Sequence, residues 1–469
     1  MKRKIAISFV LFFITLSLFA SLRSEMQLLT KKYKLSNASI GITVQRTKNG
    51  KDLYQYQSDK TFIPASNNKL FTAISALLAL PPNFTFNTTI YIDPAKVHNK
   101  ILNGNLYIQF TGDPSLTSSR LKALIQKLKT HGIDNIKGDV VLVANRFSGD
   151  LYPEGWSKSD MDYCYAAPSS SMNLNRNCMI ISVDSAGDGK SEIKRLTNTQ
   201  GVKIINQLTL VSGKKANSCQ FKSLMTGENI LYLTGCIPNQ AHTRMSFAIS
   251  NPALKTLDMV TDILNNDHID VSGSIAIGNL PNKLTPIVKT NSSSLDQMIK
   301  HMLLHSDNLY AESIAKSIGF YVNGIGSTPS ASEAMTSTLQ NDLKLNTKRL
   351  ILKDGSGLSH FDKTTPNFLA TMLTKAFNNK QIGKRLYREL PISGISGTIK
   401  YRMNSKSLLG KVRAKTGTLD GTIALSGYVV TKQKHRLSFS IMINDLNKNQ
   451  RRSARAFQNA AVQLFYNYL

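Results

Sequence analysis

Strand-forming sequence lies at both ends of this chain, and this arrangement restricts the fold more than any other feature. Near the start, residues 38–45 alternate between apolar and polar positions, as expected for a strand with one buried face. Asn49-Gly50 is a strong signal for a hairpin turn, and residues 52–56 form a second short strand-like run. The start of the chain therefore predicts a β-hairpin.

Three more strand-like runs stand near the other end, at residues 408–415, 422–431 and 436–444. Asp420-Gly421 predicts a tight turn between the first two of them. A last amphipathic segment covers residues 450–469. Together the two ends predict an α+β fold with one five-stranded antiparallel sheet, built from two early and three late strands.

The middle of the chain has a different character. Its 469 residues exceed one ordinary domain, and residues 85–285 are rich in short strand-like runs separated by Gly, Asp and Asn. We expect a catalytic domain made of residues 25–84 and 286–469, interrupted by a β-rich inserted domain at 85–285. A smaller module near 186–265 is expected within that insertion.

A nearly apolar helix is expected at residues 67–80, directly after Pro64-Ala65-Ser66 and ended by Pro81-Pro82. Because it is apolar almost all round, it should be buried in the centre of its domain. Further helices are expected at residues 295–304 and 309–319, with a weaker pattern at 332–345.

The N-terminus reads Met1-Lys2-Arg3-Lys4 and continues as an uncharged run to Leu22. A short basic stretch before an apolar core is typical of a secretory signal, so we expect residues 1–24 to direct export to the periplasm. Ala20 suits a signal-peptidase site but Leu18 does not. The segment is therefore read either as a cleaved signal peptide or as a retained membrane anchor.

The chain carries 58 Lys and Arg against 29 Asp and Glu, a formal net charge of +29. Such a charge favours polyanionic surroundings. No basic helix with interleaved aromatic residues is present, and the export signal argues against nucleic acid. Wall polymers, lipopolysaccharide or peripheral membrane contact are the expected partners, although a generally basic proteome would explain the charge equally well. The oligomeric state is left open.

The four cysteines Cys164, Cys178, Cys219 and Cys236 fall within one stretch of the chain. In an oxidising compartment a clustered, even set indicates disulfides, for which three pairings exist. Pairing in sequence order is favoured because both loops would be short. A zinc site is the weaker reading because the chain has no C-x-x-C element.

The first candidate for chemistry is Ser66 with Lys69. A serine at a helix start lies where backbone N–H groups stabilise negative charge, and a lysine three residues on shares its face. A desolvated lysine can lose its proton and act as the base toward the hydroxyl. The spacing alone is weak, since Ser119/Lys122 and Ser313/Lys316 share it.

Two other short segments complete the set. Ser306-Asp307-Asn308 lies between two expected helices, where taken alone it would read as an ordinary N-cap. Lys415-Thr416-Gly417 lies in a strand-like run, where it could bind a carboxylate and pair with an extended peptide, or be a plain strand end. The order Ser-x-x-Lys, Ser-x-Asn, Lys-Thr-Gly is the signature of class A β-lactamases and penicillin-binding proteins.

With a spacing of 240 residues between Ser66 and Ser306, the sequence resembles the class C low-molecular-mass penicillin-binding proteins, the D-alanyl-D-alanine carboxypeptidase/endopeptidase family. Other matching segments are residues 160–164, 176–178 and 354–359. The resemblance covers essentially the whole mature chain. It implies a penicillin-binding/β-lactamase-like transpeptidase domain with a large insertion, acting on peptidoglycan stem peptides and cross-links and acylated by β-lactams.

The resemblance also implies roles for the residues. Ser66 would be the acylated nucleophile and Lys69 its base. Ser306 would relay a proton toward the leaving amine beside Lys415, and Asn308 would hold the substrate amide.

The strand residues would bind the substrate. Lys415, Thr416 and Gly417 would receive the terminal carboxylate and the peptide backbone, while the N–H groups of Ser66 and Thr418 would form the oxyanion hole.

Asp160 resembles the family's acidic residue that faces the amino group of a diaminopimelate side chain. One position departs from the family pattern: His360 follows Asp-Gly-Ser-Gly-Leu-Ser, where family members often carry Arg. Recognition of the peptide side chain is therefore left open by the sequence, as is the balance of carboxypeptidase and endopeptidase activity.

No cofactor and no metal are expected. His301 and His305 are four residues apart, but position 302 is Met where a zinc-protease motif needs Glu. Two other functions compete with the peptidase. A class A β-lactamase would need a deacylating Glu-x-x-Leu-Asn, whereas Glu333 is followed by Ala-Met-Thr-Ser. A non-catalytic wall-binding protein would gain little from an activated nucleophile.

Overall fold

The computed structural model describes residues 22–239 and 242–469. The expected export segment therefore lies almost wholly outside the described residues. Within these ranges no helix is both long enough and apolar enough to cross a bilayer. The chain forms two compact units, the first made of the residues up to Leu80 with Asp296–Asp307 and Ser332–Leu469, and the second of Pro81–Leu295 with Asn308–Ala331. The expected limits of the inserted domain stay a prediction.

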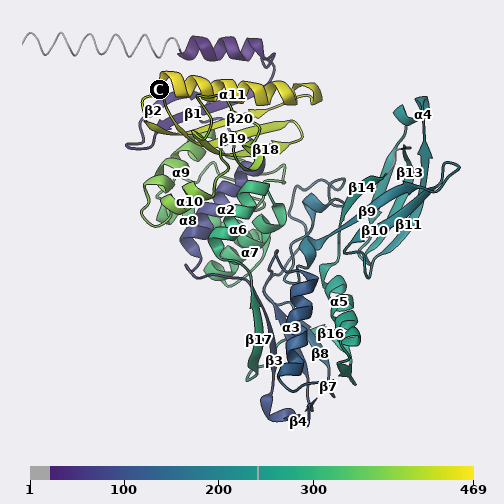
Figure 1. The fold of residues 1–469 in the computed structure, drawn as a ribbon. Coiled ribbons are helices and arrows are strands. Elements are labelled where there is room, and N and C mark those ends of the chain that lie inside the picture. Colours follow the sequence, from purple (N-terminus) through teal and green to yellow (C-terminus); the bar gives the residue numbers. More distant parts are fainter. Residues whose placement is uncertain (1–21, 240–241) are drawn as a thin grey trace, which may run out of the picture. The chain divides into compact units, whose positions relative to one another are not determined.

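The first unit is built on a five-stranded sheet in the order β18-β19-β20-β1-β2 (Figure 1). All its neighbours are antiparallel, which confirms the expected α+β architecture with a sheet drawn from both ends of the chain. Its strands are β1 (Ser39–Arg46), β2 (Asp52–Tyr56), β18 (Val412–Leu419), β19 (Thr422–Val430) and β20 (Arg436–Asn444).

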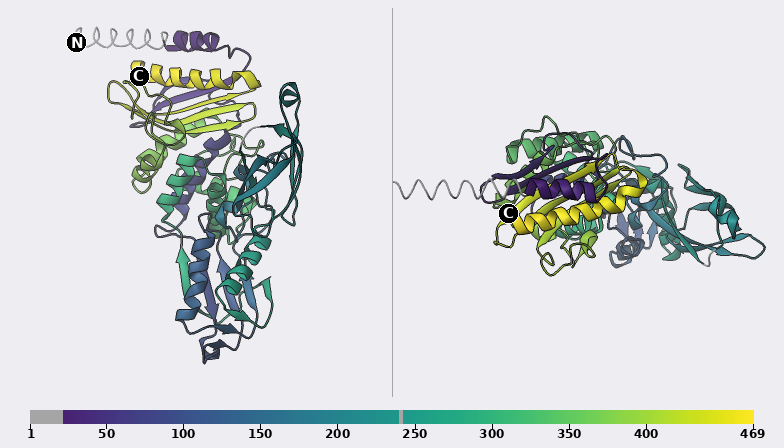
Figure 2. Two further views of the ribbon diagram at one scale, coloured as in Figure 1. Left: turned by 45° about the vertical axis from the view of Figure 1, so that its right-hand side comes forward. Right: turned by 90° about the horizontal axis from the view of Figure 1, so that it is seen from above.

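Helices cover both faces of this sheet. The C-terminal helix α11 (Arg451–Tyr468) and the helix at residues 22–32 lie side by side on one face (Figure 2). Alternate strand residues such as Val44 and Phe439 pack there against Phe457 of α11. The opposite face receives α9 (Pro366–Asn378), which contacts β1 and β20. The other helices centred in this unit are α2 (Asn68–Ala79), α6 (Leu295–His305), α8 (Thr328–Asp342) and α10 (Gly383–Glu389).

One strand boundary differs from the sequence-based expectation. β18 begins at Val412, not at 408, and it runs through Lys415-Thr416-Gly417 to Leu419. The turn at Asp420-Gly421 explains the shift because it pairs Leu419 with Thr422 and thereby sets the register of the whole ladder. Lys415 therefore lies inside the edge strand and not at its end.

The second unit holds a five-stranded sheet in the order β16-β8-β6-β3-β17, formed by Ile275–Gly278, Val140–Val143, Leu106–Phe110, Asn87–Ile92 and Thr285–Asn291. Helices α3 (Ser118–Thr130) and α5 (Pro252–Asn266) contribute to the same core. Helix α5 was not expected in the β-rich region, although Asn251 caps it and Pro252 opens it. Helix α7 (Asn308–Asn323) also belongs to this unit.

Smaller sheets complete the second unit. Two three-stranded sheets have the orders β10-β9-β14 and β11-β13-β12, and a further small sheet has the order β15-β7-β5-β4. Their strands are β4 (Val97–His98), β5 (Ile101–Leu102), β7 (Asn135–Ile136), β9 (Cys178–Ser185), β10 (Ser191–Thr197), β11 (Lys203–Val211), β12 (Phe221–Met225), β13 (Ile230–Pro238), β14 (Thr243–Ala248) and β15 (Asp270–Val271).

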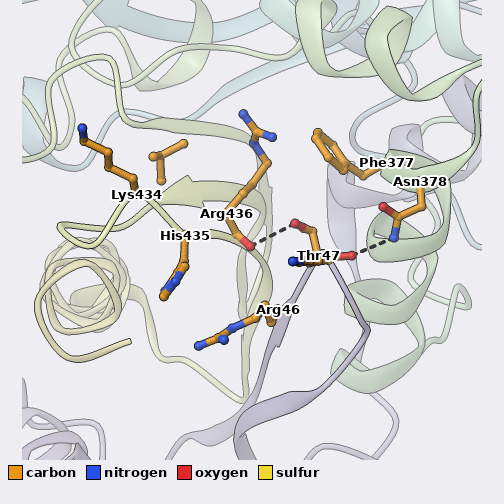
Figure 3. Close-up of a pocket in the computed structure, with 9 residues that line it drawn as sticks. Arg46, Thr47, Phe377, Asn378, Lys434, His435 and Arg436 are labelled. Atoms are coloured by element: carbon orange, nitrogen blue, oxygen red, sulfur yellow. Dashed lines mark hydrogen bonds between the residues drawn. The ribbon is translucent and has the colours of Figure 1, made fainter.

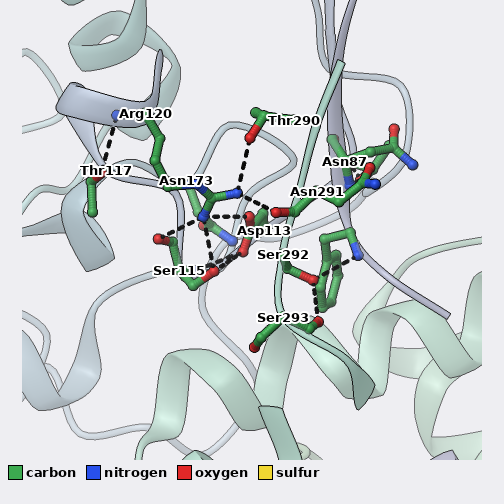
Figure 4. Close-up of polar contacts among 12 residues, drawn as sticks. Asn87, Asp113, Ser115, Thr117, Arg120, Asn173, Thr290, Asn291, Ser292 and Ser293 are labelled. Atoms are coloured by element: carbon green, nitrogen blue, oxygen red, sulfur yellow. Dashed lines mark hydrogen bonds and ion pairs between the residues drawn. The ribbon is translucent and has the colours of Figure 1, made fainter. Parts of the chain in front are cut away.

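A partly buried ionic cluster ties α3 to β17 (Figure 4). Arg120 donates to Asp113 Oδ2 at 3.3 Å and to the carbonyl of Asn291 at 2.6 Å. Burial raises the pKa of the Asp113 carboxyl, while hydrogen bonds from Ser115 and the charge of Arg120 oppose that effect. These contacts fix the start of helix α3 against the end of strand β17.

Both favoured disulfides are present, Cys164–Cys178 and Cys219–Cys236. The first ties the segment before β9 to the start of that strand, and the second joins β13 to the segment just before β12. Pairing in sequence order is thus confirmed.

Candidate active site

Ser66 lies in a short 3-10 turn, η1 (Ala65–Asn67), that leads into the buried helix α2. The preceding Ala65 has φ +46°, an uncommon conformation for a residue with a side chain. The turn can lie where it does only because residue 357 is a glycine: a Cβ at Gly357 would lie 1.9 Å from the Ala65 carbonyl oxygen. The backbone thus presents a half-buried Ser66 hydroxyl at the start of the helix.

Lys69 lies one turn farther along α2 and is fully buried. Its Nζ is 3.1 Å from Ser66 Oγ and 2.6 Å from the backbone carbonyl oxygen of Ser356. The amine is therefore held at the Ser66 hydroxyl by an acceptor from another part of the chain. At 3.1 Å the amine and the Ser66 hydroxyl are close enough to exchange a proton.

The second pair consists of Lys415 and Ser306. Lys415 Nζ donates to Ser306 Oγ at 2.8 Å and to its neighbour's carbonyl, Thr416 O, at 2.8 Å. Ser306 has φ +55°, a second left-handed residue at the site. Strand β18 supplies one partner and the end of helix α6 the other, so residues far apart in the sequence meet here.

The electrostatics of Lys415 link the two pairs. Complete burial lowers the pKa of its amine well below the usual value, and the nearby charge of Lys69 lowers it further. Two ammonium groups in one dry site repel each other. The arrangement therefore favours a state in which one lysine is neutral and can act as a base.

The Lys-Thr-Gly strand presents mixed chemistry along one edge of the sheet. Thr416 donates its hydroxyl to Thr398 Oγ1 at 2.8 Å, and Thr418 is exposed. A Cβ at Gly417 would lie 2.7 Å from the Pro64 carbonyl oxygen, so only glycine lets β18 approach the turn that carries Ser66. Thr398 is a neighbour that sequence reasoning missed, because nothing in its local pattern marks it.

The loop at residues 354–359, which the sequence marks only as a match to the family, supports the position of Lys69. Asp354 is completely buried and accepts hydrogen bonds from the backbone N–H groups of residues 356–359. Asn68 Nδ2 of helix α2 donates to the same carboxylate at 3.1 Å and to the Asp354 carbonyl at 2.8 Å. This loop carries the Ser356 carbonyl that receives Lys69.

Asn308 and Asp160 lie in the second unit, where Tyr165 connects them. Asn308 Nδ2 donates to the Tyr165 carbonyl oxygen at 2.7 Å, and the Tyr165 hydroxyl donates to Asp160 Oδ1 at 2.7 Å. Burial and the adjacent Asp160 raise the pKa of the Tyr165 phenol, so it stays a donor. The ring stacks on Tyr163, 5.9 Å between centroids.

The two histidines considered for a metal are engaged otherwise. His301 Nε2 lies 3.2 Å from Asp307 Oδ2, and the rings of His301 and His305 are 4.6 Å apart between centroids. Among the described residues no group of three or more His, Cys, Asp or Glu side chains could hold a metal ion.

Comparison with known proteins gives a consistent result. Residues 22–467 match the D-Ala-D-Ala carboxypeptidase 3 (S13) family. A D-alanyl-D-alanine carboxypeptidase, DacB, of Haemophilus influenzae is 29% identical over 87% of this chain and 85% of its own length. A D-alanyl-D-alanine carboxypeptidase of Actinomadura sp. is 26% identical over 90% of this chain and 81% of its own.

Solved structures agree. Penicillin-binding protein 4 of Haemophilus influenzae superposes with a TM-score of 0.88 at 28% identity, covering 94% of this chain and 99% of that one. The same protein in complex with a β-lactam gives a TM-score of 0.83 at 26% identity, with the same coverage. A predatory endopeptidase of Bdellovibrio bacteriovorus, at 15% identity and a TM-score of 0.52, shares the fold.

Proposed function

This chain belongs to the D-Ala-D-Ala carboxypeptidase 3 (S13) family, and from that premise we propose that it hydrolyses D-alanyl peptide bonds of peptidoglycan through an acyl-enzyme on Ser66. The observation that carries this assignment is the meeting of Lys69 Nζ with Ser66 Oγ at 3.1 Å beside a second buried lysine. The family and its relatives make the chain a serine-type D-Ala-D-Ala carboxypeptidase.

Acylation begins with a proton transfer from Ser66 Oγ to Lys69 Nζ. The Ser66 oxygen attacks the carbonyl carbon of the penultimate D-alanine, and the backbone N–H groups of Ser66 and Thr418 stabilise the oxyanion. Ser306, hydrogen-bonded to Lys415 at 2.8 Å, passes a proton to the leaving nitrogen. The peptide bond then breaks and the terminal D-alanine departs, after which water cleaves the ester.

Substrate binding uses the strand edge. Lys415 and the Thr416 hydroxyl receive the terminal carboxylate, and Gly417 lets the peptide pair with β18 as an added strand. Asn308 holds the substrate amide. Asp160 faces the cationic end of the stem-peptide side chain, and its hydrogen bond from Tyr165 supports a fixed position for that carboxylate.

The same chemistry on a cross-link gives endopeptidase activity, and on a β-lactam it gives a covalent adduct because the ring nitrogen cannot leave. An exported location is supported by the two disulfides, which persist in oxidising compartments. We place the enzyme in the periplasm. Its net charge of +29 supports peripheral contact with anionic envelope surfaces.

The decisive experiment is intact-mass analysis after incubation with benzylpenicillin. We expect one adduct on the wild type and none on Ser66→Ala. Ser119→Ala is the matched control, since Ser119 and Lys122 repeat the spacing at exposed positions of α3, and it should label like the wild type. Rapid penicillin turnover without an adduct would indicate a β-lactamase, and neither adduct nor turnover would contradict the acyl-enzyme assignment.

A further inference from the structure

Two basic turns meet at one end of the sheet in the first unit. Strands β1 and β20 pair antiparallel with Arg46 opposite Leu437, so the turn after β1 lies beside the turn before β20. Thr47 locks them together, because its N–H and its hydroxyl both donate to the Arg436 carbonyl, at 3.1 Å and 3.0 Å. Figure 3 shows Thr47 between Arg436 and Asn378, whose amide donates to the Thr47 carbonyl at 2.7 Å.

A cavity of about 500 Å³ opens at this point. Its charged lining is entirely basic: Arg46, Lys48, Lys434, His435 and Arg436, without a carboxylate. It shares no lining residue with the group around Ser66. The two arginines reach it from opposite faces of the sheet. Arg46 is two residues after the core residue Val44 and therefore points to the same face as Val44. Arg436 lies on the other face, where it stacks against Phe377 of α9.

The cations of this cavity are not compensated by the protein. Within the described ranges, the side chains of Arg46, Lys48, Lys434 and Arg436 form no ion pair, and the buried Nε atoms of both arginines have no hydrogen-bond partner. Arg436 is nevertheless held in place. Its guanidinium lies 4.6 Å from the Phe377 ring centroid and 4.9 Å from that of Tyr387. Stacking fixes the plane of the group and leaves its edge available for an anion.

The geometry points to an anion site for a phosphate-bearing ligand, of the phosphomonoester or pyrophosphate class. The lining holds four lysine and arginine side chains and a histidine, more basic groups than a single carboxylate could balance, whereas a phosphomonoester carries close to two negative charges at neutral pH. Guanidinium groups also match phosphate oxygens bidentately. Because cations approach from both faces of the sheet, a ligand with two phosphoryl groups fits better than a single one. Binding here would hold the enzyme to phosphate-bearing envelope material without occupying the catalytic residues.

The test is calorimetric titration of the full chain with inorganic pyrophosphate and with inorganic phosphate. Lys48→Gln/Lys434→Asn removes two exposed cations of the cavity, and asparagine suits the left-handed φ of +64° at position 434. Lys127→Gln/Lys129→Gln on helix α3 removes the same charge elsewhere and serves as the control. A third variant, Arg46→Gln, removes a guanidinium. Benzylpenicillin labelling of Ser66 verifies that every variant is folded.

We expect pyrophosphate to bind more tightly than phosphate, and the affinity to fall at least about tenfold in the cavity variants with the control unchanged. Cosedimentation with phosphatidylglycerol vesicles distinguishes the two sources of phosphate. If the cavity variants no longer sediment with the vesicles, the ligand is a lipid phosphate. If they still sediment with the vesicles but have lost pyrophosphate binding, the ligand is a soluble or polymer-borne phosphate. No pyrophosphate binding by the wild type, or an equal loss in the control, would overturn the proposal.

Discussion

At the scale of single residues, the buried amine of Lys415 makes stability depend on pH. Its folded-state pKa lies below the ordinary value of 10.5, so between those two values the unfolded chain binds a proton that the folded chain releases. The free energy of unfolding should therefore rise with pH across that window. It should level off above pH 10.5, where the amine is neutral in both the folded and the unfolded chain.

Lys415→Met should remove this dependence. We expect the urea midpoint of the wild type to climb between neutral pH and pH 10 relative to the variant, whose curve should be flatter. Lys411→Met, at an exposed position just before β18, is the control and should follow the wild type. Parallel curves for Lys415→Met and the wild type would mean that Lys415 is charged in the folded protein at neutral pH.

Asp354 is the residue whose role the sequence conceals. Its carboxylate accepts hydrogen bonds from four backbone N–H groups. An asparagine in its place would point its NH₂ group, which is a donor, at some of these N–H donors. Asp354→Asn should destabilise the chain by about 2 kcal/mol and slow acylation as well, because the loop then no longer fixes the Ser356 carbonyl at Lys69.

Asp362→Asn is the matched control for that change. Asp362 is an equally buried carboxylate that accepts the Lys353 N–H at 2.7 Å, but it does not carry the acceptor of Lys69. Thermal melting and the rate of benzylpenicillin labelling should both fall for Asp354→Asn, and melting alone for Asp362→Asn. Equal labelling rates in the two variants would show that the loop has no positioning role.

At the scale of elements, the sequence predicted the sheet of the first unit because strand periodicity and two glycine turns are local signals. Asn49-Gly50 and Asp420-Gly421 fix the two hairpins, and the pairing of β1 with β20 then joins the chain ends. The start of β18 was placed wrongly because the register comes from the turn and not from hydrophobicity.

The candidate site was predictable for the same kind of reason, and only in part. Ser66, Lys69, Ser306 and Lys415 stand in short motifs whose residue types indicate their chemistry. No local pattern marks Thr398 in the first unit or Tyr165 in the second. The role of the Tyr165 carbonyl as the acceptor for Asn308 depends on backbone geometry that no residue type encodes.

Gly357 tests how one element positions another. Its φ is +79° and a Cβ would lie 1.9 Å from the Ala65 carbonyl, so Gly357→Ala must displace either its own loop or the turn that carries Ser66. We expect labelling by benzylpenicillin to slow about a hundredfold, since small displacements of a nucleophile have large effects. Gly132→Ala, also at positive φ but with open space around it, is the control, and an equal effect there would reject the close approach as the cause.

At the scale of the whole molecule, the two disulfides should stabilise the chain similarly but differ in function. They close loops of similar length, with sequence separations of 14 and 17, so each should contribute about 3 kcal/mol by restricting the unfolded chain. Only Cys164 adjoins Tyr165, which receives Asn308 on its carbonyl and donates to Asp160 through its hydroxyl.

Cys164→Ser/Cys178→Ser should therefore lower both the melting temperature and the rate of D-alanine release from a stem peptide, the latter roughly tenfold, because the support of Asn308 loosens. Cys219→Ser/Cys236→Ser should lower the melting temperature by a similar amount and leave that rate within about twofold. Rates measured well below either melting transition separate the two effects. If both variants lose the same activity at equal stability, the Cys164–Cys178 bridge serves folding alone, and the position of Asn308 must be set by helix α7 itself.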